Sequence, residues 1–253
     1  MSSNYDILIE KIFFDRYKNN LNSFTFLRTD PEDTCEKLNI NKPKNLGDVV
    51  YSYRFRKKLP NSISRTLSNG DEWIIVGAGI GEYEFRIASP SKLTPDKNIK
   101  PIKILDATPE ILKRFAPSTD EQALLTKVRY NRLVDIFLGI TCYSIQNHFR
   151  TTVSDIGQIE VDEIYICVDK KGKLFSIPCQ AKSSGDSFGI VQAMQDKSLC
   201  QEKYKNTECL PLVMQFINEN LIAMAIVDVE TDKSGKSTFM KVDEKHYQLI
   251  QNS

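Results

Sequence analysis

The chain has 253 residues, enough for one large domain or two small ones. Hydrophobic residues make up 41% and charged residues 26%, which is ordinary for a soluble globular protein, and every apolar run is too short for a membrane span. Because the N-terminal residues lack the basic start and long apolar stretch of a signal peptide, we expect a cytoplasmic protein. The formal net charge of +1 means that nucleic-acid binding would require local segregation of basic residues.

Cysteine and histidine usage excludes several kinds of site. The six cysteines are scattered without a CxxC pair, so we expect small buried hydrophobic residues and neither a disulfide nor a zinc site. The two histidines, His148 and His246, disfavour a His-rich metal site or a Ser/His/Asp hydrolase. We expect His148 to be partly buried.

Residues 1–90 have the element order of a winged helix. Apolar residues at helical spacing predict helices at residues 5–17, 31–38 and about 45–58, the last stopped by Pro60. Residues 73–76 and 83–87 then predict a β-hairpin. Three short helices followed by a hairpin indicate a winged-helix-like DNA-binding domain, whose third helix enters the major groove.

A basic run overlaps the third predicted helix. Between Tyr51 and Arg65 there is no acid, and Tyr51, Tyr53 and Phe55 alternate with basic residues. The candidate DNA-binding residues of this run are Arg54, Arg56, Lys57, Lys58 and Arg65. Such a run suits contacts to phosphates, and a solvated helix face is the alternative interpretation.

The glycine cluster Gly77–Gly81 contains a GxGxG pattern. A nucleotide-binding loop would require a helix directly after it, whereas the following residues favour a strand. We therefore expect a hairpin turn.

The remaining chain predicts a linker and a second domain. Residues 91–117 are expected to be a linker with a short helix at 109–115, and the second domain covers residues 118–253. Its predicted elements are a helix from 118 to about 137, strands at 158–169 and 174–182, a helix at 189–204, strands at 210–216 and 223–230, and a final strand or irregular segment.

The hairpin of the second domain carries the most informative spacing in the sequence. A turn centred on Lys171 places Asp162 opposite Gln180. Because side chains alternate between the two faces of a strand, Gln180 and Lys182 share the face on which Glu160 and Asp162 emerge. Glu163 falls on the other face, where we expect a structural or solvated role.

This D…QxK spacing and the surrounding element order resemble the restriction-endonuclease-like PD-(D/E)xK nuclease superfamily, with Gln180-Ala181-Lys182 similar to the QxK variant of Mrr-like enzymes. The resemblance implies an α/β (α+β) fold with a mixed sheet flanked by helices. It also implies phosphodiester hydrolysis with Mg²⁺, for which Mn²⁺ can substitute. By the same resemblance, Asp162 is the metal-binding aspartate, Gln180 the second metal-facing residue, Lys182 the catalytic lysine, and Glu121 the weaker match to an upstream helical acid.

The chemistry of phosphodiester hydrolysis requires the same types of residue. Negative charge develops on oxygens that are already charged, so the site must hold a divalent cation and a second positive group. Asp162 and Glu160 are the candidate anchors of the cation, Lys182 can steady the attacking hydroxide, and Gln180 offers a neutral carbonyl ligand. Gln192 and Gln195, on the next predicted helix, either approach this site, with Gln192 as a further candidate DNA-binding residue, or belong to a solvated face.

We therefore expect a type II restriction endonuclease that cuts double-stranded DNA, with a homodimer implied by the resemblance. One alternative is a DNA-binding protein that keeps a nuclease-like fold without catalysis. Another is a nuclease acting on RNA or on branched or damaged DNA.

Overall fold

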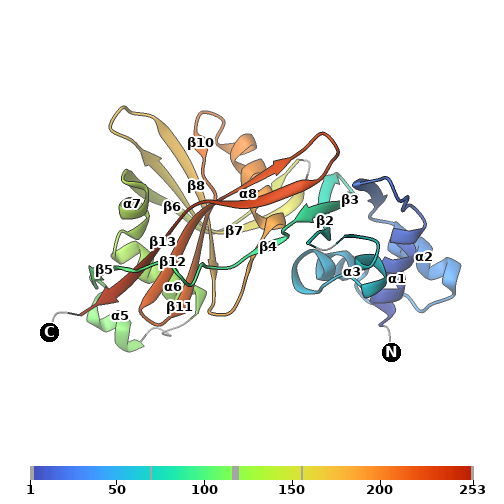
Figure 1. Cartoon of the computed structure of the whole chain (residues 1–253), viewed down its shortest axis with the longest axis horizontal. Helices are drawn as coiled ribbons and strands as arrows, with labels where there is room; N and C mark the ends of the chain where they lie inside the picture. The colour runs from blue at the N-terminus through green and yellow to red at the C-terminus, as the bar shows by residue number, and fades with distance from the viewer. Residues whose placement is uncertain (1–2, 69, 116–119, 155, 252–253) are drawn as a thin grey trace.

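The computed structural model describes residues 3–68, 70–115, 120–154 and 156–251. Within them the protein is mixed α/β, with an 11-stranded sheet flanked by helices. The molecule is elongated, and the N-terminal helices lie at the end opposite the C-terminus (Figure 1). None of the described helices is long and apolar enough to cross a membrane.

The N-terminal elements largely follow the predicted order. They are α1 (Asn4–Phe14), β1 (Ser23–Leu27), α2 (Asp30–Leu38), α3 (Leu46–Tyr51), a π-helical turn η1 (Ser52–Arg56), α4 (Asn61–Ser64), β2 (Glu72–Gly79) and β3 (Glu82–Ser89). The predicted hairpin is confirmed, since β2 and β3 pair antiparallel around the glycine cluster. The predicted third helix is divided into α3 and η1, and strand β1, which pairs with β3, was missed.

Aromatic packing holds these elements together. The fully buried Phe13 ring of α1 lies edge-on to Phe24, Trp73 and Phe85, with centroids 5.1 to 5.2 Å apart. Edge-to-face contacts of this kind add to the free energy gained by burying the rings. Helix α1 is thereby fixed to β1 and to the β2–β3 hairpin.

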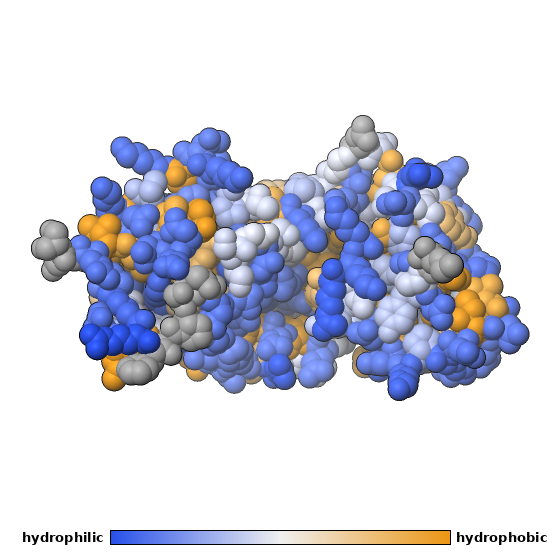
Figure 2. All heavy atoms as spheres, turned by 90° about the horizontal axis from the view of Figure 1, so that it is seen from below, coloured by the Kyte–Doolittle hydropathy of each residue, from blue (hydrophilic) through white to orange (hydrophobic). Residues whose placement is uncertain are grey.

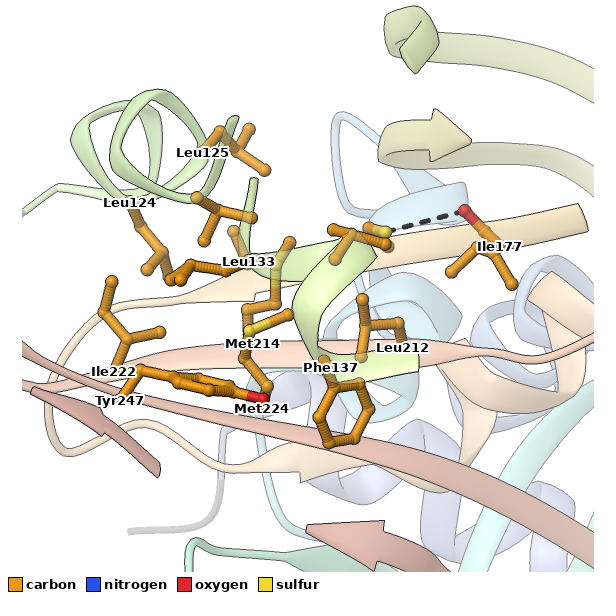
Figure 3. Packing of buried hydrophobic residues seen from close by; sticks show 14 of the residues in the cluster. Leu124, Leu125, Leu133, Phe137, Ile177, Leu212, Met214, Ile222, Met224 and Tyr247 are labelled. Atoms are coloured by element: carbon orange, nitrogen blue, oxygen red, sulfur yellow. Dashed lines mark hydrogen bonds between the residues drawn. The ribbon is translucent and has the colours of Figure 1, made fainter. Parts of the chain in front are cut away.

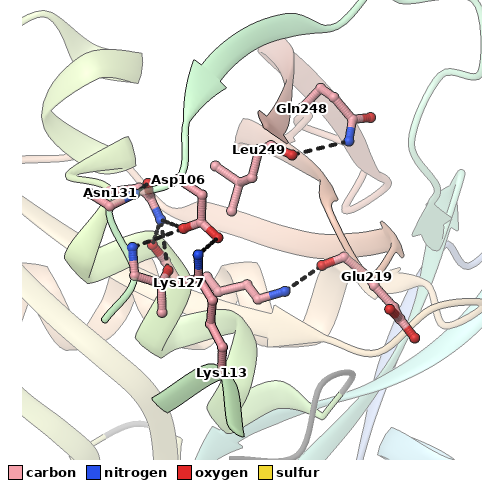
Figure 4. Close-up of polar contacts among 9 residues, drawn as sticks. Asp106, Lys113, Lys127, Asn131, Glu219, Gln248 and Leu249 are labelled. Carbon is pink, nitrogen blue, oxygen red and sulfur yellow. Dashed lines mark hydrogen bonds and ion pairs between the residues drawn. The ribbon is translucent and has the colours of Figure 1, made fainter. Parts of the chain in front are cut away.

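The predicted linker contains regular structure. Its elements are β4 (Lys92–Leu93), β5 (Ile102–Leu105) and α5 (Glu110–Phe115), so the short helix is confirmed. The prediction of an irregular linker is wrong for residues 102–105, because they form strand β5, which pairs with residues 247–250 of the main sheet. Asp106 follows β5 and contacts Lys113 and Asn131 (Figure 4). Burial raises the pKa of Asp106, but hydrogen bonds from Thr108, Lys113 and Asn131 prevail and lower it to about 2.

The single helix expected from residue 118 to about 137 is divided in two, because Arg132 interrupts it with a left-handed backbone conformation. The elements of the second half also include the predicted hairpin, the predicted helix at 189–204 and further strands. They are α6 (Glu121–Tyr130), α7 (Leu133–Leu138), β6 (Thr141–Val153), β7 (Gly157–Val168), β8 (Leu174–Lys182), β9 (Phe188–Gly189), α8 (Ile190–Lys203), β10 (Glu208–Cys209), β11 (Leu212–Asn218), β12 (Leu221–Thr231) and β13 (Ser237–Ile250). The predicted start of this part, Ser118 and Thr119, lies outside the described residues.

Strand β6 was not predicted, and its pairing corrects the expectation about cysteines. Cys142 of β6 lies directly opposite Cys167 of β7, and the two form a disulfide. The antiparallel pairing of β6 and β7 brings the two sulfurs together. The separation of 25 residues in the sequence does not reveal this pairing. Four other cysteines are free.

The sheet is covered on both faces. Along the strand order β13-β12-β11-β8-β7-β6, α8 connects the parallel neighbours β8 and β11. Figure 3 shows Leu124, Leu133 and Phe137 of α6 and α7 packed over one face, against side chains that include Met214. The adjacent Val213 belongs to the cluster on the other face, which includes residues of α8 and β2. Alternate residues of the central strands thus face opposite layers.

The N-terminal elements join this sheet through strand pairing and a close backbone contact. Strand β3 pairs parallel with β13 at Ala88 and Ser237. Gly77 of β2 lies against the backbone of Ile156, and a Cβ atom at position 77 would be only 2.9 Å from the Cα and carbonyl oxygen of Ile156. Glycine at position 77 therefore permits this approach.

We expect Gly77→Ala to lower the free energy of unfolding by about 1–3 kcal/mol, because the added methyl group collides with backbone that cannot rotate away. Urea denaturation measures the change. Gly47→Ala is the matched control, since its Cβ meets only the Asn45 side chain, at 3.3 Å, and alanine favours the helix. Equal stabilities of the two variants would contradict the proposed close contact.

Candidate active site

The register of the β7–β8 hairpin is the one predicted from the sequence. Glu163 pairs with Cys179, and the next pair along the ladder would be Asp162 and Gln180. At this point a side chain accepts the hydrogen bond in place of a backbone carbonyl: the Ala181 N–H donates to Asp162 Oδ2 at 2.8 Å. The carboxylate of Asp162 is thereby held beside β8.

A cleft of about 360 Å³ opens on this face of the hairpin. Its wall contains Glu160, Asp162, Gln180 and Lys182 from the hairpin and Gln192 and Gln195 from α8. Five of the predicted site residues thus share one cleft, and Gln195, which was left open as a solvated residue, is buried in its wall. Tyr51 and Phe55 from the N-terminal elements and Arg150 from β6 also contribute.

Glu121 reaches the edge of this group from the first turn of α6. Asp120 caps the helix by accepting a hydrogen bond from the Ala123 N–H at 2.7 Å, which fixes where α6 begins. Glu121 Oε1 then lies 3.9 Å from Lys182 Nζ, and the Lys182 side chain is only 16% exposed. Burial raises the pKa of Glu121, the charge of Lys182 opposes this, and Asp162 adds to it.

Gln180 is held by an aspartate that the sequence analysis missed. Its Nε2 donates to Asp196 Oδ1 at 3.1 Å and approaches Oδ2 at 3.3 Å, and both side chains are buried. Because the amide nitrogen faces Asp196 on α8, the carbonyl oxygen Oε1 is the end of the amide left for a ligand. No donor in the described part of the chain binds this oxygen. Asp196 therefore determines which end of Gln180 is available.

The partly buried Asp162 and the buried Asp196 hold protons more strongly than usual. Burial raises the pKa of Asp162, against the lowering effects of the Ala181 N–H and the Lys182 charge. Burial also raises the pKa of Asp196 well above its ordinary range, and the hydrogen bond from Gln180 opposes this. A bound cation would favour the ionised form of a neighbouring carboxylate.

Other predicted residues have different environments. Glu160 is half exposed and pairs with Arg150, 3.1 Å from Nε to Oε2, so its carboxylate already has a cationic partner. Glu163 is completely buried and accepts two hydrogen bonds from Arg129, at 3.0 and 3.1 Å, which confirms a structural role. His148 is exposed, so the expectation that it is partly buried was wrong.

The donor set fits a divalent cation held partly by a substrate. Among the described residues there is no cluster of three or more His, Cys, Asp or Glu side chains that could hold a metal. Mg²⁺ usually binds proteins through one or two carboxylates and completes its shell with water and substrate phosphates. Asp162 and the Gln180 carbonyl satisfy this smaller requirement, while Glu160 lies in the wall of the same cleft and Glu121 lies beside Lys182.

The basic run divides into exposed and buried members. Arg56, Lys57, Lys58 and Arg65 are exposed. Arg54 is largely buried, and its guanidinium stacks over the rings of Phe55 and Tyr83, at 4.9 and 5.5 Å from the centroids. Arg54 is therefore placed to hold the hairpin against η1, in contrast to its exposed neighbours.

Two site residues escaped the sequence analysis for identifiable reasons. Asp196 lies four residues after Gln192 in α8, so helical spacing would have placed both on one face. Arg150 lies on β6, the strand that was not predicted.

No family model matches the chain, and neither does any curated protein or solved structure.

We expect Gln180→Glu to lower the free energy of unfolding by about 1–3 kcal/mol, because two buried carboxylates would then lie within hydrogen-bonding distance. Adding Asp196→Asn should recover most of the loss, since the new amide can donate to the new carboxylate. Urea denaturation measures both variants.

Gln192→Glu serves as the control, because Gln192 lines the cleft and is only partly buried. Its effect should stay within about 0.5 kcal/mol. Failure of Asp196→Asn to rescue Gln180→Glu would contradict the proposed coupling of positions 180 and 196.

Proposed function

We propose that this protein is a Mg²⁺-dependent endonuclease that hydrolyses phosphodiester bonds of double-stranded DNA, most similar to a type II restriction enzyme. The observation that carries the proposal is that Asp162, Gln180 and Lys182 line one cleft and that Glu121, from a third element, lies beside Lys182. These residues provide an anionic ligand, a neutral carbonyl ligand and a cation next to each other. That is the combination required to hold and cleave a phosphodiester.

The fold supports this proposal. Helix α6 precedes the meander β6–β7–β8, and α8 leads to β11, parallel to β8, as a nuclease domain of the PD-(D/E)xK type would require. In the N-terminal half, helices α1 to α3 precede the β2–β3 hairpin, and β1 pairs with β3. This order supports a winged-helix-like module for residues 1–90. We retain residues 91–117 as the connection and residues 118–253 as the nuclease domain.

The charges of the site assign a role to each residue. A bound Mg²⁺ would supply positive charge at the phosphate and favour hydroxide over water. Asp162, fixed by the Ala181 N–H, and Gln180, fixed by Asp196, would hold that ion. Lys182, next to Glu121, would orient the attacking hydroxide and balance the charge that develops on the phosphate.

The surface is compatible with a DNA partner. Hydrophilic residues predominate along one side of both halves (Figure 2). The exposed Arg56 ends η1 and Lys57 and Lys58 follow it, and the neighbouring Tyr51 and Phe55 line the cleft. A strand bound along Arg56, Lys57 and Lys58 would therefore lead toward Asp162. A homodimer, which would cut both strands, remains part of the proposal.

We expect Lys182→Ala to lower plasmid cleavage in the presence of Mg²⁺ by at least about 100-fold, because the charge that stabilises the transition state is lost. EDTA should abolish cleavage by the wild type. Lys173→Ala is the control, since Lys173 pairs with Glu208 at the far end of β8 and should leave the rate unchanged. Full activity of Lys182→Ala would reject the assignment.

A non-catalytic DNA-binding protein is the second candidate function. The neutral Gln180 and the absence of a three-carboxylate cluster from the described residues favour it. Calorimetry with Mg²⁺ and Mn²⁺ in the presence of DNA separates the two functions, because only the nuclease requires cation binding at Asp162.

The affinity for Mg²⁺ should increase as the pH rises through the raised pKa values of Asp162 and Glu121, because protons compete with the cation for these carboxylates. Without the cation, stability should decrease over the same change. The folded state retains protons that the unfolded state has already released, so deprotonation disfavours folding. Calorimetry measures the first effect and urea denaturation the second, and an affinity independent of pH would contradict the expected competition.

A further inference from the structure

Two aromatic side chains from the N-terminal half form part of the wall of the catalytic cleft. Tyr51 ends α3 and Phe55 lies in η1, four residues later, so they share a face of the helical segment. Their ring centroids are 4.9 Å apart and the rings are tilted by 53°. Both line the same cleft as Asp162 and Lys182, which come from the other half of the chain.

The exposure of Tyr51 distinguishes it from a core residue. Tyr51 is 46% exposed, whereas Tyr53, between the two rings, is 5% exposed and belongs to the N-terminal hydrophobic core. No hydrogen bond of the Tyr51 hydroxyl is formed within the described residues. Packing of the N-terminal core therefore does not require this ring.

A guanidinium accompanies each ring. The exposed Arg56 lies over Tyr51, 4.8 Å from the centroid, and the largely buried Arg54 lies over Phe55 at 4.9 Å, so of these two guanidinium groups Arg56 is the one open to a phosphate. The exposed Lys57 and Lys58 follow immediately. Aromatic faces next to cations are the combination that binds single nucleic-acid strands, because the rings stack on bases while the cations attract the phosphates.

The dimensions of the cleft limit what can enter it. At about 360 Å³ it falls at the lower end of the range of small-molecule sites. This volume is sufficient for one nucleotide unit. A base stacked on Tyr51 would lie in the same cavity as a phosphate at Asp162 and Lys182.

We infer that Tyr51, supported from behind by the partly buried Phe55, stacks on one unpaired nucleobase of the strand whose phosphate lies at Asp162 and Lys182. The substrate is thus a strand with a single-stranded nucleotide or one extruded from a duplex, at the position of the cut. This inference rests on the proposed function, because the catalytic residues define where the phosphate lies.

Binding measured without cleavage tests the inference. Fluorescence anisotropy in EDTA compares a 12-nucleotide thymidine strand with an abasic strand of the same length and charge. The wild type should bind the thymidine strand about 5- to 100-fold more tightly, which is the contribution of one stacked base. Tyr51→Ala should remove most of this preference, and Tyr51→Phe should retain it.

Tyr130→Ala is the matched control. Tyr130 is 47% exposed, is not among the residues that line the cleft, and should leave the preference unchanged. Circular dichroism and thermal unfolding verify that each variant is folded. If Tyr51→Ala keeps the preference of the wild type, or the wild type shows none, the stacking inference is wrong.

Plasmid cleavage by the wild type with Mg²⁺ separates this failure from failure of the proposed function. If the wild type cleaves the plasmid but shows no base preference, or a preference that Tyr51→Ala does not change, only the stacking inference is rejected. Cleavage that is absent with Mg²⁺, together with a base preference that depends on Tyr51, rejects the nuclease and leaves a binding site for single strands. If neither is observed, both proposals are rejected.

Discussion

The pairing register of β7 and β8 is the constraint on which the rest of the structure depends. These strands lie between β6 and β11 in the central sheet, and the alternation of their side chains decides which residues face each layer. With Glu163 opposite Cys179, both lie buried within the protein, while Asp162, Gln180 and Lys182 line the cleft. A shift by one residue would bring Glu163 into the cleft and bury Asp162 in its place.

A single buried hydrogen bond extends this constraint to α8. Asp196 binds the amide nitrogen of Gln180, and both side chains are nearly inaccessible to solvent. A carboxylate is costly to bury, so its presence here requires a donor, and the amide supplies one. The acid at position 196 thus requires a hydrogen-bond donor at position 180, which an amide provides and a carboxylate would not. Position 180 can still present an oxygen, because the amide is held by its nitrogen.

The two halves of the chain meet at the cleft. Gly77 allows β2 to approach Ile156, and β3 extends the sheet beside β13. This arrangement places Tyr51 and Phe55 across from Asp162. A substrate in the cleft would contact both halves at once, so strand recognition and chemistry would share one cavity. The different colours of α3 and β8 in Figure 1 show that these two elements lie far apart in the sequence, so only tertiary packing can bring their side chains to one cleft.

The sequence alone determined the β7–β8 hairpin, its register, the shared face of Asp162, Gln180 and Lys182, and the position of Glu163 on the other face, because strand alternation and turn chemistry are local. Local patterns did not reveal β6, the Cys142–Cys167 disulfide or the strand at residues 102–105, since these depend on partners distant in the chain. Only the tertiary structure decided that Asp196 orients Gln180, that Arg150 binds Glu160, and that Tyr51 reaches the cleft. The reason is physical: a side-chain contact between different elements depends on how their layers pack, and no periodicity within one element encodes it.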